Sequence, residues 1–509
     1  MNLGRPNSIN FKNVSTLTEN EMVTPVGGQR LLSVFEDSPK RFQRIKFLAN
    51  LYQTNGYELR IAGGAVRDIV SGLKPHDIDF ATTATPDESL KILKDYEDLL
   101  RIIVTAAGLR HGTVAVKFKE GNLDFKRIKL HSESDNCNEP HAAPHEVPKN
   151  KPEYDEESPY EITTLRSDDH TDGRHAEVNF IKDWRIDAER RDLTINAMFL
   201  TLDDGRLIDY YNGESDLKNG VVRFVGDPEK RLKEDYLRIL RFFRFWSRYG
   251  KNRPDSETLS TIRENLSGLD IISGERIWVE VKKILSHLPT LEVIKLMLEL
   301  RVFEKFGLLD LHNDEALIGE IKLVEKNIED YLQRDIVSQL TKGESDPFTK
   351  KVKDLLPVIL FATLVSSSKA VTNVHQRLKL SNLERDSILY IVENRSNIIS
   401  LKSIKHQLAI ARAPDRPLVM NKLRALLIYS GKFELIDEMQ NWQVPNFPLS
   451  GHIISQAVRK YKLPRDAIGT IQESLKDEWV ESDYKSSVED LNQSLMSKLK
   501  ELHSSLNKT

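Results

Sequence analysis

The sequence has very little cysteine, no long apolar run and no excess of either charge. Cys137 is the single cysteine among 509 residues, so no disulfide can form within the chain. This suits a reducing compartment such as the cytosol, the nucleus or the mitochondrial matrix. No apolar run approaches the roughly 18–20 residues that span a bilayer, and we expect no membrane partner. Because 74 Lys and Arg stand against 77 Asp and Glu, any nucleic-acid contact must come from local basic patches.

The rest of the composition is that of a soluble protein with several domains. Hydrophobic residues make up 39% and charged residues 30% of a chain that is long enough for roughly three domains. Alternation of polar and apolar residues predicts short strands at 57–64, 76–82, 112–118 and 160–166, and helical spacing predicts a helix at 65–73. The first part of the chain is therefore expected to mix strands with helices.

From about Arg223 onward, nearly every segment has the spacing of an amphipathic helix. Residues 229–250 predict one long helix, and residues 488–506 predict another with leucines from Leu491 to Leu502 on one face. The predicted fold class is α+β, with a mixed head followed by an all-helical remainder.

Two segments lack the periodicity of a folded element. Residues 1–35 are rich in Asn, Ser and Thr and are interpreted either as a mitochondrial presequence or as a disordered terminus, with Met22 as a second start. Residues 131–159 are polar and contain several prolines, which predicts a disordered insertion. Cys137 and the histidines four and eight residues after it lie in this insertion. We do not interpret them as a metal site, because no predicted helix holds them in register and no fourth ligand is evident.

Two aspartates, Asp77 and Asp79, stand one residue apart in a predicted strand. Residues i and i+2 of a strand point to the same face, so the two carboxylates would lie side by side. That pairing is unfavourable unless a cation sits between them, and Mg²⁺ prefers one or two carboxylates together with substrate phosphates. A solvated acidic strand would give the same pattern, so this motif alone is weak.

A glycine pair, Gly63 and Gly64, stands between the first predicted strand and the helix that follows it. Glycines there leave backbone N–H groups open and let phosphates approach without a Cβ in the way. Arg67, near the start of that helix, can bind phosphate oxygens. A tight turn beside an acidic surface strand is the competing interpretation, and the joint arrangement makes it less favourable.

The segment "AERRDLTINAMFL", residues 188–200, carries two adjacent cations, Arg190 and Arg191. Asp192 and Asn196 are four residues apart and would share one helical face, where they could bind ribose hydroxyls while the arginines hold phosphates. A solvated helix start with an aspartate near the helix dipole is equally compatible with this pattern.

The segment "EDYLRILRFFRF" places Asp235 and Arg238 three residues apart, on one face of the predicted helix. Cytosine and adenine both carry an exocyclic amine beside a ring nitrogen acceptor, whereas uracil and guanine present a carbonyl and an N–H. An Asp and Arg edge therefore matches the first pair and repels the second. An ordinary i,i+3 salt bridge explains the same spacing.

Taken together and in this order, the motifs resemble those of the class II tRNA nucleotidyltransferases, the CCA-adding enzymes. The resemblance is dense from about residue 58 to 285, and several phrases are most similar to the animal members. It rests on "LRIAGGAVRDIVSGLKPHDIDFATTATP", "EITTLR", "DGRHAEV", "RRDLTINAMF", "DYYNGESDL", "EDYLRILRFFRF" and "SGERIWVE".

The resemblance implies a role for each matching residue of the phosphate and metal site. Asp77 and Asp79 would be catalytic and hold two Mg²⁺ ions, while Gly63, Gly64 and Arg67 would cradle the triphosphate.

The resemblance also implies that Arg190, Arg191, Asp192, Asn196 and Arg241 bind the nucleotide, with Asp192 near the ribose.

Asp235 and Arg238 would be the protein template that selects CTP and then ATP. Glu234 would orient this pair, and Arg276 would support the template helix. Glu161 is a weaker candidate for a third carboxylate.

Asp209, Gly213 and Asp216 would form a D-x₃-G-x₂-D element that couples movements of the head to the next domain. The implied fold is a nucleotidyltransferase head like that of DNA polymerase beta, a small mixed sheet with helices, followed by an all-α neck, body and tail. The expected bounds are 1–35 for the terminus, 36–206 for the head, 207–286 for the neck, 287–395 for the body and 396–509 for the tail.

The implied reaction is metal-assisted, with the 3′-hydroxyl of the tRNA attacking the α-phosphate of CTP or ATP and pyrophosphate leaving. The expected partner is tRNA that lacks part or all of its 3′ CCA, bound by a monomer or homodimer in the mitochondrion and in the cytoplasm or nucleus. Three alternatives stay open: a related poly(A) polymerase, an enzyme that adds only CC or only A, and a catalytically silent RNA-binding protein.

Overall fold

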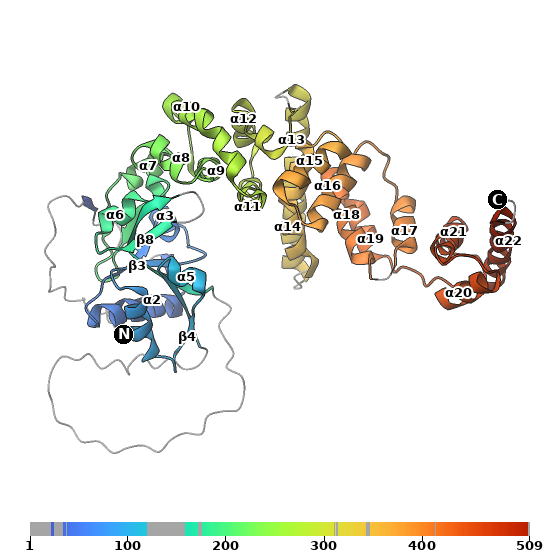
Figure 1. Ribbon diagram of the computed structural model, residues 1–509, viewed down its shortest axis with the longest axis horizontal. Helices are drawn as coiled ribbons and strands as arrows, with labels where there is room; N and C mark the ends of the chain where they lie inside the picture. The colour runs from blue at the N-terminus through green and yellow to red at the C-terminus, as the bar shows by residue number, and fades with distance from the viewer. Residues whose placement is uncertain are drawn as a thin grey trace, which may run out of the picture. The chain divides into compact units, whose positions relative to one another are not determined.

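The computed structural model divides the chain into two compact units, Met1–Ile272 and Ser273–Thr509 (Figure 1). The break falls inside the predicted neck, and the finer division into neck, body and tail stays a prediction. The structure describes residues 22–24, 34–36, 38–119, 158–171, 176–309, 311, 314–342, 347–412 and 414–506.

The first unit is built on a mixed sheet whose strands run in the order β1-β10-β9-β2-β3-β6-β5-β4. Neighbouring strands are antiparallel except for β3 and β6, which are parallel. A small second sheet pairs β7 with β8. The strands are β1 Met22–Thr24, β2 Leu59–Ala62, β3 Asp79–Thr82, β4 Leu100–Ile103, β5 Thr113–Phe118, β6 Tyr160–Thr164, β7 Arg166–Thr171, β8 Ala176–Phe180, β9 Met198–Leu200 and β10 Leu207–Asp209.

Helices cover the sheet and then continue the chain beyond it. In the first unit they are α2 Pro39–Thr54, α3 Gly64–Val70, α4 Pro86–Lys94, α5 Ala106–Arg110, α6 Trp184–Glu189, η2 Thr194–Asn196, α7 Gly213–Asn219, α8 Pro228–Glu234, α9 Arg238–Tyr249, α10 Ser256–Asn265 and η3 Leu266–Ile271.

The core of the first unit lies between α2, α3 and one face of the sheet. Leu48 and Tyr52 of α2 are fully buried in one cluster with Ile61 of β2 and Phe80 of β3. Each large apolar side chain buried in this way contributes roughly 1.5–3 kcal/mol. Alternation along β5, where every second residue is buried, sets which face of the sheet meets the helices. This packing fixes the ends of β2 and β3, from which the site residues project.

Several predicted elements are confirmed. β2, β5 and β6 lie within the segments that periodicity marked as strand. α3 overlaps the helix predicted at 65–73, but it begins one residue earlier, at Gly64, and ends at Val70. The α+β class is confirmed as well, since the described part of the second unit is helical.

The second unit consists of helices throughout its described residues (Figure 1). Its final helix matches the predicted bounds, and Leu491, Leu495 and Leu499 are buried in a cluster with Trp479 of the preceding helix. The helices are α11 Gly274–Leu285, α12 Leu291–Glu299, η4 Val302–Phe306, α13 Glu315–Lys342, α14 Pro347–Phe361, η5 Ala362–Leu364, α15 Ser368–Leu378, α16 Asn382–Asn394, α17 Leu401–Ile410, α18 Arg416–Tyr429, α19 Phe433–Asn441, α20 Gly451–Lys460, α21 Ala467–Glu481 and α22 Val488–Leu506.

The predicted long helix at 229–250 is wrong, because the structure has two helices, α8 and α9, with a break at 235–237. Asp235 has an extended backbone, with φ −155° and ψ 105°. Its carboxylate accepts a hydrogen bond from the Leu237 N–H at 3.1 Å, and its carbonyl accepts one from the Arg238 N–H at 3.0 Å. A short acidic side chain that binds a nearby backbone N–H offers the chain an alternative to the helix.

Two predicted boundaries also need correction. Residues 22–24 form β1, which pairs with β10, so the interpretation of all of 1–35 as disordered is too broad. β10 belongs to the same sheet, so the head continues past residue 206 and the neck is not all-α from 207. The predicted insertion lies almost entirely outside the described residues, as do Cys137 and the two histidines. Along the described helices, none is long and apolar enough to cross a membrane.

Candidate active site

The glycine pair lies where β2 passes into α3. Gly63 has φ +65°, a backbone conformation that favours glycine, and its N–H donates to the carbonyl of Met198 in β9. A Cβ added to Gly63 would lie 3.0 Å from Nη1 of Arg191. The Arg191 guanidinium therefore stands directly against the glycine turn, although the two residues are far apart in the sequence.

Arg67 is 7% exposed, and its guanidinium is held on all sides within the first unit. Nη1 donates to Oδ1 of Asn196 at 2.6 Å, and Nη2 donates to Oδ1 of Asp68 at 2.8 Å. The guanidinium carbon lies 4.6 Å from the ring centre of Tyr249 and 5.1 Å from that of Phe245, both on α9. Arg67 thus ties α3 to η2 and α9, and its contact with phosphate stays a prediction.

The two aspartates flank the start of β3 rather than lying together within it. β3 begins at Asp79, and Asp77 precedes it in the loop, so the strand predicted at 76–82 is shorter than expected. Asp77 is exposed, and its Oδ1 lies 2.9 Å from Nδ1 of His76. The parallel partner of Asp79 in β6 is Glu161, the candidate third carboxylate.

The carboxylates in this region influence each other electrostatically. Surrounding protein atoms, the charge of Glu161 and the charge of Asp77 together raise the pKa of Asp79 to about 6, against the opposing charge of Arg191. Partial burial acts in the same direction on Asp77, but hydrogen bonds from Ser158 and His76 outweigh it and lower the pKa of Asp77. Within the described ranges no three His, Cys, Asp or Glu side chains form a ready-made metal cluster.

The segment 188–200 does not form the expected helix. α6 ends at Glu189, Arg190 caps it, and the chain continues through η2 into β9. The N–H of Thr194 donates to the Arg223 carbonyl at 3.1 Å, which pulls the backbone out of α-helical geometry. Asp192 and Asn196 nevertheless meet, with 3.3 Å between Nδ2 of Asn196 and Oδ1 of Asp192.

Asp192 is buried, and α9 holds it. Nε of Arg241 donates to Oδ2 of Asp192 at 2.7 Å, and Nη2 of Arg241 lies 2.6 Å from the same oxygen. Burial alone would raise the pKa of Asp192, but the Arg241 guanidinium reverses this and keeps the pKa below its ordinary value. Asp192 is therefore an anion at neutral pH.

Both arginines of "RRD" share one aspartate that the sequence analysis did not single out. The Asp187 side chain in α6 is 1% exposed and pairs with Arg190 at 2.6 Å and with Arg191 at 3.0 Å. The i,i+3 and i,i+4 spacing from Asp187 was the available sequence signal. The sequence analysis also missed Thr194, because the carboxylate that accepts its hydroxyl, that of Asp216, is 22 residues away in the sequence.

The D-x₃-G-x₂-D element packs directly behind η2. The Asp209 carboxylate accepts hydrogen bonds from the N–H groups of Gly213 and Glu214 at 3.0 and 2.9 Å, which caps α7. Oδ2 of Asp216 accepts the Thr194 hydroxyl at 2.6 Å. A Cβ added to Gly213 would lie 2.2 Å from the Thr194 carbonyl oxygen, so only glycine fits. The element supports the backbone that carries Asn196.

We expect Gly213→Ala to destabilise the first unit by about 3 kcal/mol, because the backbone of α7 or η2 must move to make room. Thermal unfolding followed by circular dichroism measures the loss. Gly319→Ala is the matched control, since Gly319 is exposed in α13 and an added Cβ meets nothing within 4 Å. This control is expected to be neutral or to stabilise by roughly 0.5–1 kcal/mol. Equal unfolding temperatures for the two variants would contradict the close approach.

The break between α8 and α9 gathers the predicted template residues. Glu234 accepts Nη1 of Arg238 at 2.6 Å and pairs with Arg231 at 2.7 Å. Nη2 of Arg238 donates to the carbonyl of Arg190 at 3.0 Å, and Nη1 of Arg231 donates to the carbonyl of Glu189 at 2.8 Å. Side chains on both sides of the helix break therefore hold the backbone of residues 189–190, next to the adjacent arginines.

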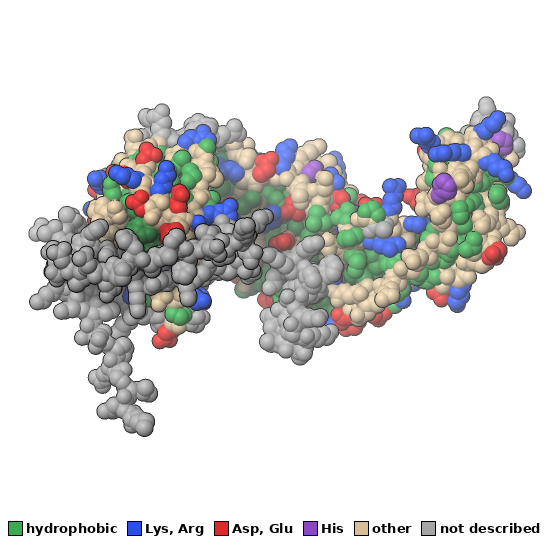
Figure 2. Space-filling model, turned by 90° about the horizontal axis from the view of Figure 1, so that it is seen from below, with side chains coloured by type: hydrophobic (Ala, Val, Ile, Leu, Met, Phe, Trp, Pro, Cys, Tyr) green, Lys and Arg blue, Asp and Glu red, His purple; other side chains and the backbone are tan. Residues whose placement is uncertain are grey.

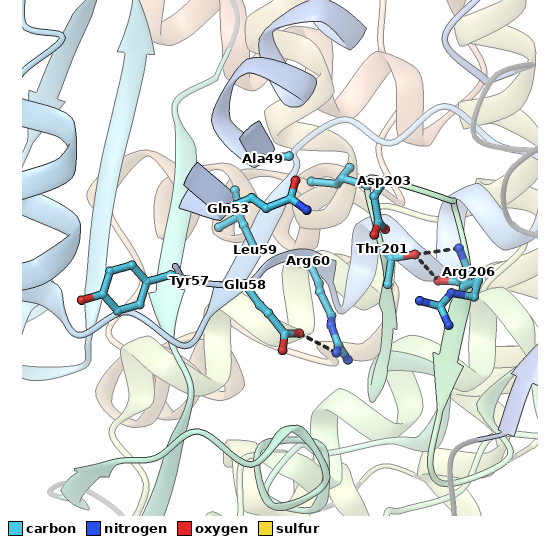
Figure 3. A pocket seen from close by; sticks show the side chains of 10 residues that line it. Ala49, Gln53, Tyr57, Glu58, Leu59, Arg60, Thr201, Asp203 and Arg206 are labelled. Atoms are coloured by element: carbon cyan, nitrogen blue, oxygen red, sulfur yellow. Dashed lines mark hydrogen bonds and ion pairs between the residues drawn. The ribbon is translucent and has the colours of Figure 1, made fainter. Parts of the chain in front are cut away.

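A cavity of about 200 Å³ lies at the other end of β2, away from the glycine turn (Figure 3). Its lining includes Arg60, Arg206 and Asp203, and the charges near it are paired with each other. Arg60 donates to Glu58 at 2.6 Å, and Arg206 pairs with Asp204. Because these charges compensate each other and the cavity lies at the far end of β2, we do not include it in the candidate active site.

Two arginines of the second unit need separate mention. Arg424 is 1% exposed within α18, so it does not lie on a solvated helix face. Arg276 lies in α11, in the second unit, and its support of the template helix stays a prediction.

Comparison with known proteins identifies the family. A family model described as the poly A polymerase head domain matches residues 59–155 and 146–223, and one described as the probable RNA and SrmB binding site of polymerase A matches 253–307. The chain is 39% identical over 458 residues to the mitochondrial CCA tRNA nucleotidyltransferase 1 of Homo sapiens, covering 88% of each chain. It belongs to the class II CCA tRNA nucleotidyltransferases.

A more distant relative agrees with this assignment, and solved structures share the fold. The nucleotidyltransferase is 32% identical to the CCA-adding enzyme of Staphylococcus epidermidis over 55% of its own length and 60% of that protein. The fold matches the Bacillus stearothermophilus CCA-adding enzyme in complex with CTP, with TM-score 0.59, 20% identity and coverage of 91% and 99%. It also matches the Thermotoga maritima enzyme complexed with tRNA, with TM-score 0.54, 19% identity and coverage of 93% and 99%. The alternatives of a silent RNA-binding protein and of a poly(A) polymerase therefore give way to CCA addition.

Proposed function

We propose that this nucleotidyltransferase builds and repairs the 3′-terminal CCA of tRNA, taking CTP twice and ATP once. One observation carries the proposal: the Arg191 guanidinium stands 3.0 Å from the Cβ position of Gly63, so a cation and a Cβ-free turn form one anion site. The carboxylates of Asp77 and Asp79 follow one helix later, at the start of β3. A triphosphate bound with metal ions needs both groups, an anion site for its phosphates and carboxylates for the metal ions.

The residues at β3 fit a divalent metal. Asp77 and Asp79 offer hard oxygen donors, and the raised pKa of Asp79 reflects a concentration of negative charge that a cation would relieve. We propose that these two carboxylates hold two Mg²⁺ ions, with Glu161 as the weaker third candidate. When bound, the metal supplies charge neutralisation and activation of the attacking hydroxyl.

The chain's own residues then orient the nucleotide. Arg190 and Arg191 bind the triphosphate, and the fixed positions that their pairing with Asp187 gives them lower the cost of ordering it. Asp192, held as an anion by Arg241, accepts a ribose hydroxyl. Because Asn196 binds both Asp192 and Arg67, the ribose contact is tied to the helix that follows the glycine turn.

We propose that Asp235 and Arg238 read the base. The carboxylate accepts a hydrogen bond from the exocyclic amine of cytosine or adenine, and the guanidinium donates to the ring nitrogen beside it. Since Nη2 of Arg238 also donates to the Arg190 carbonyl, base reading and the phosphate-binding segment are linked through one side chain. One helix break carries these groups: Asp235 lies in it, and Arg238 and Arg241 lie in the first turn of α9. This closeness supports a compact template.

Basic side chains of the second unit would hold the body of the tRNA. Figure 2 shows Lys and Arg side chains gathered at the C-terminal end of this unit. Such surfaces bind the phosphate backbone without regard to sequence.

A direct assay tests the function. The protein is incubated with tRNA that ends before CCA and with each labelled nucleotide, singly and together. Two C additions followed by a single A are expected, and UTP and GTP should not be incorporated. Long A tails would instead indicate a poly(A) polymerase, addition of only CC or only A would indicate a partial enzyme, and no incorporation would overturn the proposal.

We further propose that the enzyme works in the mitochondrion and in the cytoplasm or nucleus. The animal relatives are named as mitochondrial enzymes, and Met22, as a second start, would remove the preceding segment while keeping β1. Sequencing the N-termini of the protein from each compartment tests this. A single shared N-terminus would contradict it.

A further inference from the structure

The carboxylate of Asp187 is the most deeply buried charge beside the nucleotide-binding segment. Its side chain is 1% exposed in α6 and uses both oxygens. Oδ1 accepts Nε and Nη2 of Arg190 at 2.8 and 2.6 Å, and Oδ2 accepts Nε and Nη2 of Arg191 at 3.2 and 3.0 Å. Each carboxylate oxygen of Asp187 thus accepts two hydrogen bonds from one arginine, and this geometry fixes the orientation of each guanidinium as well as its distance.

Asp187 is itself anchored to the fold. Its Oδ1 also accepts the backbone N–H of Arg166, at the start of β7, at 3.2 Å. Burial would raise the pKa of Asp187, but the two guanidiniums outweigh it and hold the pKa below its ordinary value. The carboxylate therefore stays charged, and its hydrogen bond to β7 restricts its rotation.

The arginines leave this anchor in a defined direction. Beyond its contact with Asp187, Arg191 directs Nη1 toward the Asn196 carbonyl at 3.3 Å and toward the Cβ position of Gly63 at 3.0 Å. Its guanidinium carbon lies 4.8 Å from the ring centre of Phe199. Two cations and one anion leave the group with a net charge of +1, so the cluster attracts phosphate even after its internal pairing.

We propose that Asp187 is a positioning residue, which holds Arg190 and Arg191 in the orientation that binds the triphosphate of the incoming nucleotide. The inference rests on the proposed function of the two arginines. A purely structural ion pair would stabilise α6 against β7 without affecting the nucleotide. The two roles differ in what happens to the KM for CTP and ATP when the carboxylate is neutralised.

The test compares Asp187→Asn with Asp187→Glu in the full-length enzyme. Asn keeps the shape but removes the charge, and Glu keeps the charge on a longer arm. We expect Asp187→Asn to raise the KM for CTP and ATP about tenfold or more, because charged hydrogen bonds to both arginines are lost. The KM for tRNA should change less than twofold. Asp187→Glu should recover part of the nucleotide affinity.

Asp183→Ala is the matched control. Asp183 caps the same helix by accepting the N–H groups of Arg185 and Ile186 at 2.8 and 3.3 Å, and it contacts neither of the two arginines in these bonds. This variant should lower the unfolding temperature while leaving both nucleotide KM values unchanged. Coupling is measured by repeating Asp187→Asn in an Arg191→Lys background, where its effect on KM should shrink by at least threefold.

The outcomes separate the inference from the function on which it rests. If Arg191→Lys leaves the nucleotide KM unchanged, the proposed role of the arginines fails, whatever Asp187→Asn does. If Arg191→Lys raises the KM but Asp187→Asn only lowers the unfolding temperature, Asp187 is structural and the inference is overturned. Should Asp187→Asn not fold, Asp187→Glu decides: an unchanged nucleotide KM in that variant overturns the inference, and a raised KM with a normal KM for tRNA supports it.

Discussion

Replacing either aspartate at the start of β3, in Asp77→Ala or Asp79→Ala, is expected to reduce nucleotide addition to tRNA by roughly a thousandfold or more. A loss of this size is typical when a group that stabilises charge in the transition state is removed. Asp79 opens the strand, and its carboxylate has a pKa raised to about 6 by the surrounding protein atoms, which displace water, and by neighbouring negative charges. Without either carboxylate, the proposed metal ions lose one of the two main oxygen ligands that we assign to them.

His76→Ala provides the control for these variants. Its ring lies 2.9 Å from the Asp77 carboxylate in the same loop, but its side chain is 89% exposed, and we interpret it as a surface residue. Addition by His76→Ala should stay within a few-fold of the original enzyme, as a single surface hydrogen bond is worth about 1 kcal/mol. Single-turnover addition of labelled CTP measures all three variants. A variant of Asp79 that still adds nucleotides at a tenth of the normal rate would contradict its role as a metal ligand.

Replacing the proposed template arginine, in Arg238→Ala, is expected to loosen the choice of nucleotide while metal binding is kept. The preference for CTP and ATP over UTP and GTP should fall roughly 10- to 100-fold, the range expected when one good paired contact to a base is lost. Arg238 also donates to the Glu234 carboxylate and to the Arg190 carbonyl, so a moderate decrease in kcat should accompany the loss of selectivity. Competition between labelled nucleotides on one tRNA measures the selectivity directly.

Two further variants sharpen this test. Asp235→Asn exchanges one acceptor for an amide that can also donate, so it should accept UTP better than the original enzyme does. Lys233→Ala is the control, because Lys233 lies in α8, just before the break, and pairs with the exposed Glu229 at 2.6 Å. Unchanged selectivity in Arg238→Ala would exclude this residue as the template. A change in Lys233→Ala as large as that in Arg238→Ala would show that the effect comes from the helix rather than from the base contact.

Local pattern was sufficient where a residue's neighbours in sequence are also its neighbours in space. Strand β5 alternates and α22 has a leucine face, so their bounds could be predicted closely. The failures occurred where a side chain competes with its own backbone or where a segment distant in sequence provides a hydrogen-bond partner. Asp235 binds the N–H of Leu237 and ends α8, and the carbonyl of Arg223 draws Thr194 away from the helix expected at 188–200.

The candidate site also divides into features that local sequence pattern predicts and features that depend on contacts between distant residues. Residue types and order alone indicated Gly63, Asp77 and Asp79 as parts of one phosphate and metal site, because a single strand–helix–strand unit carries them. The partners that orient the site were not predictable in this way. Arg67 meets Asn196 across 129 residues, and this contact depends on the packing of α3 against η2.

By itself, the sequence determined the α+β class and the family and indicated the residues that we propose carry the chemistry, because these depend on composition, on short spacings and on the order of motifs. The tertiary structure decided which of those residues meet. It put Arg191 against the Gly63 turn and gave Arg190 and Arg191 a shared anion in Asp187. It also joined the Arg238 side chain to the backbone of Arg190. The physical reason is that a buried charge must find its partner in space, and the partner's place is set by how the helices pack on the sheet rather than by distance along the chain.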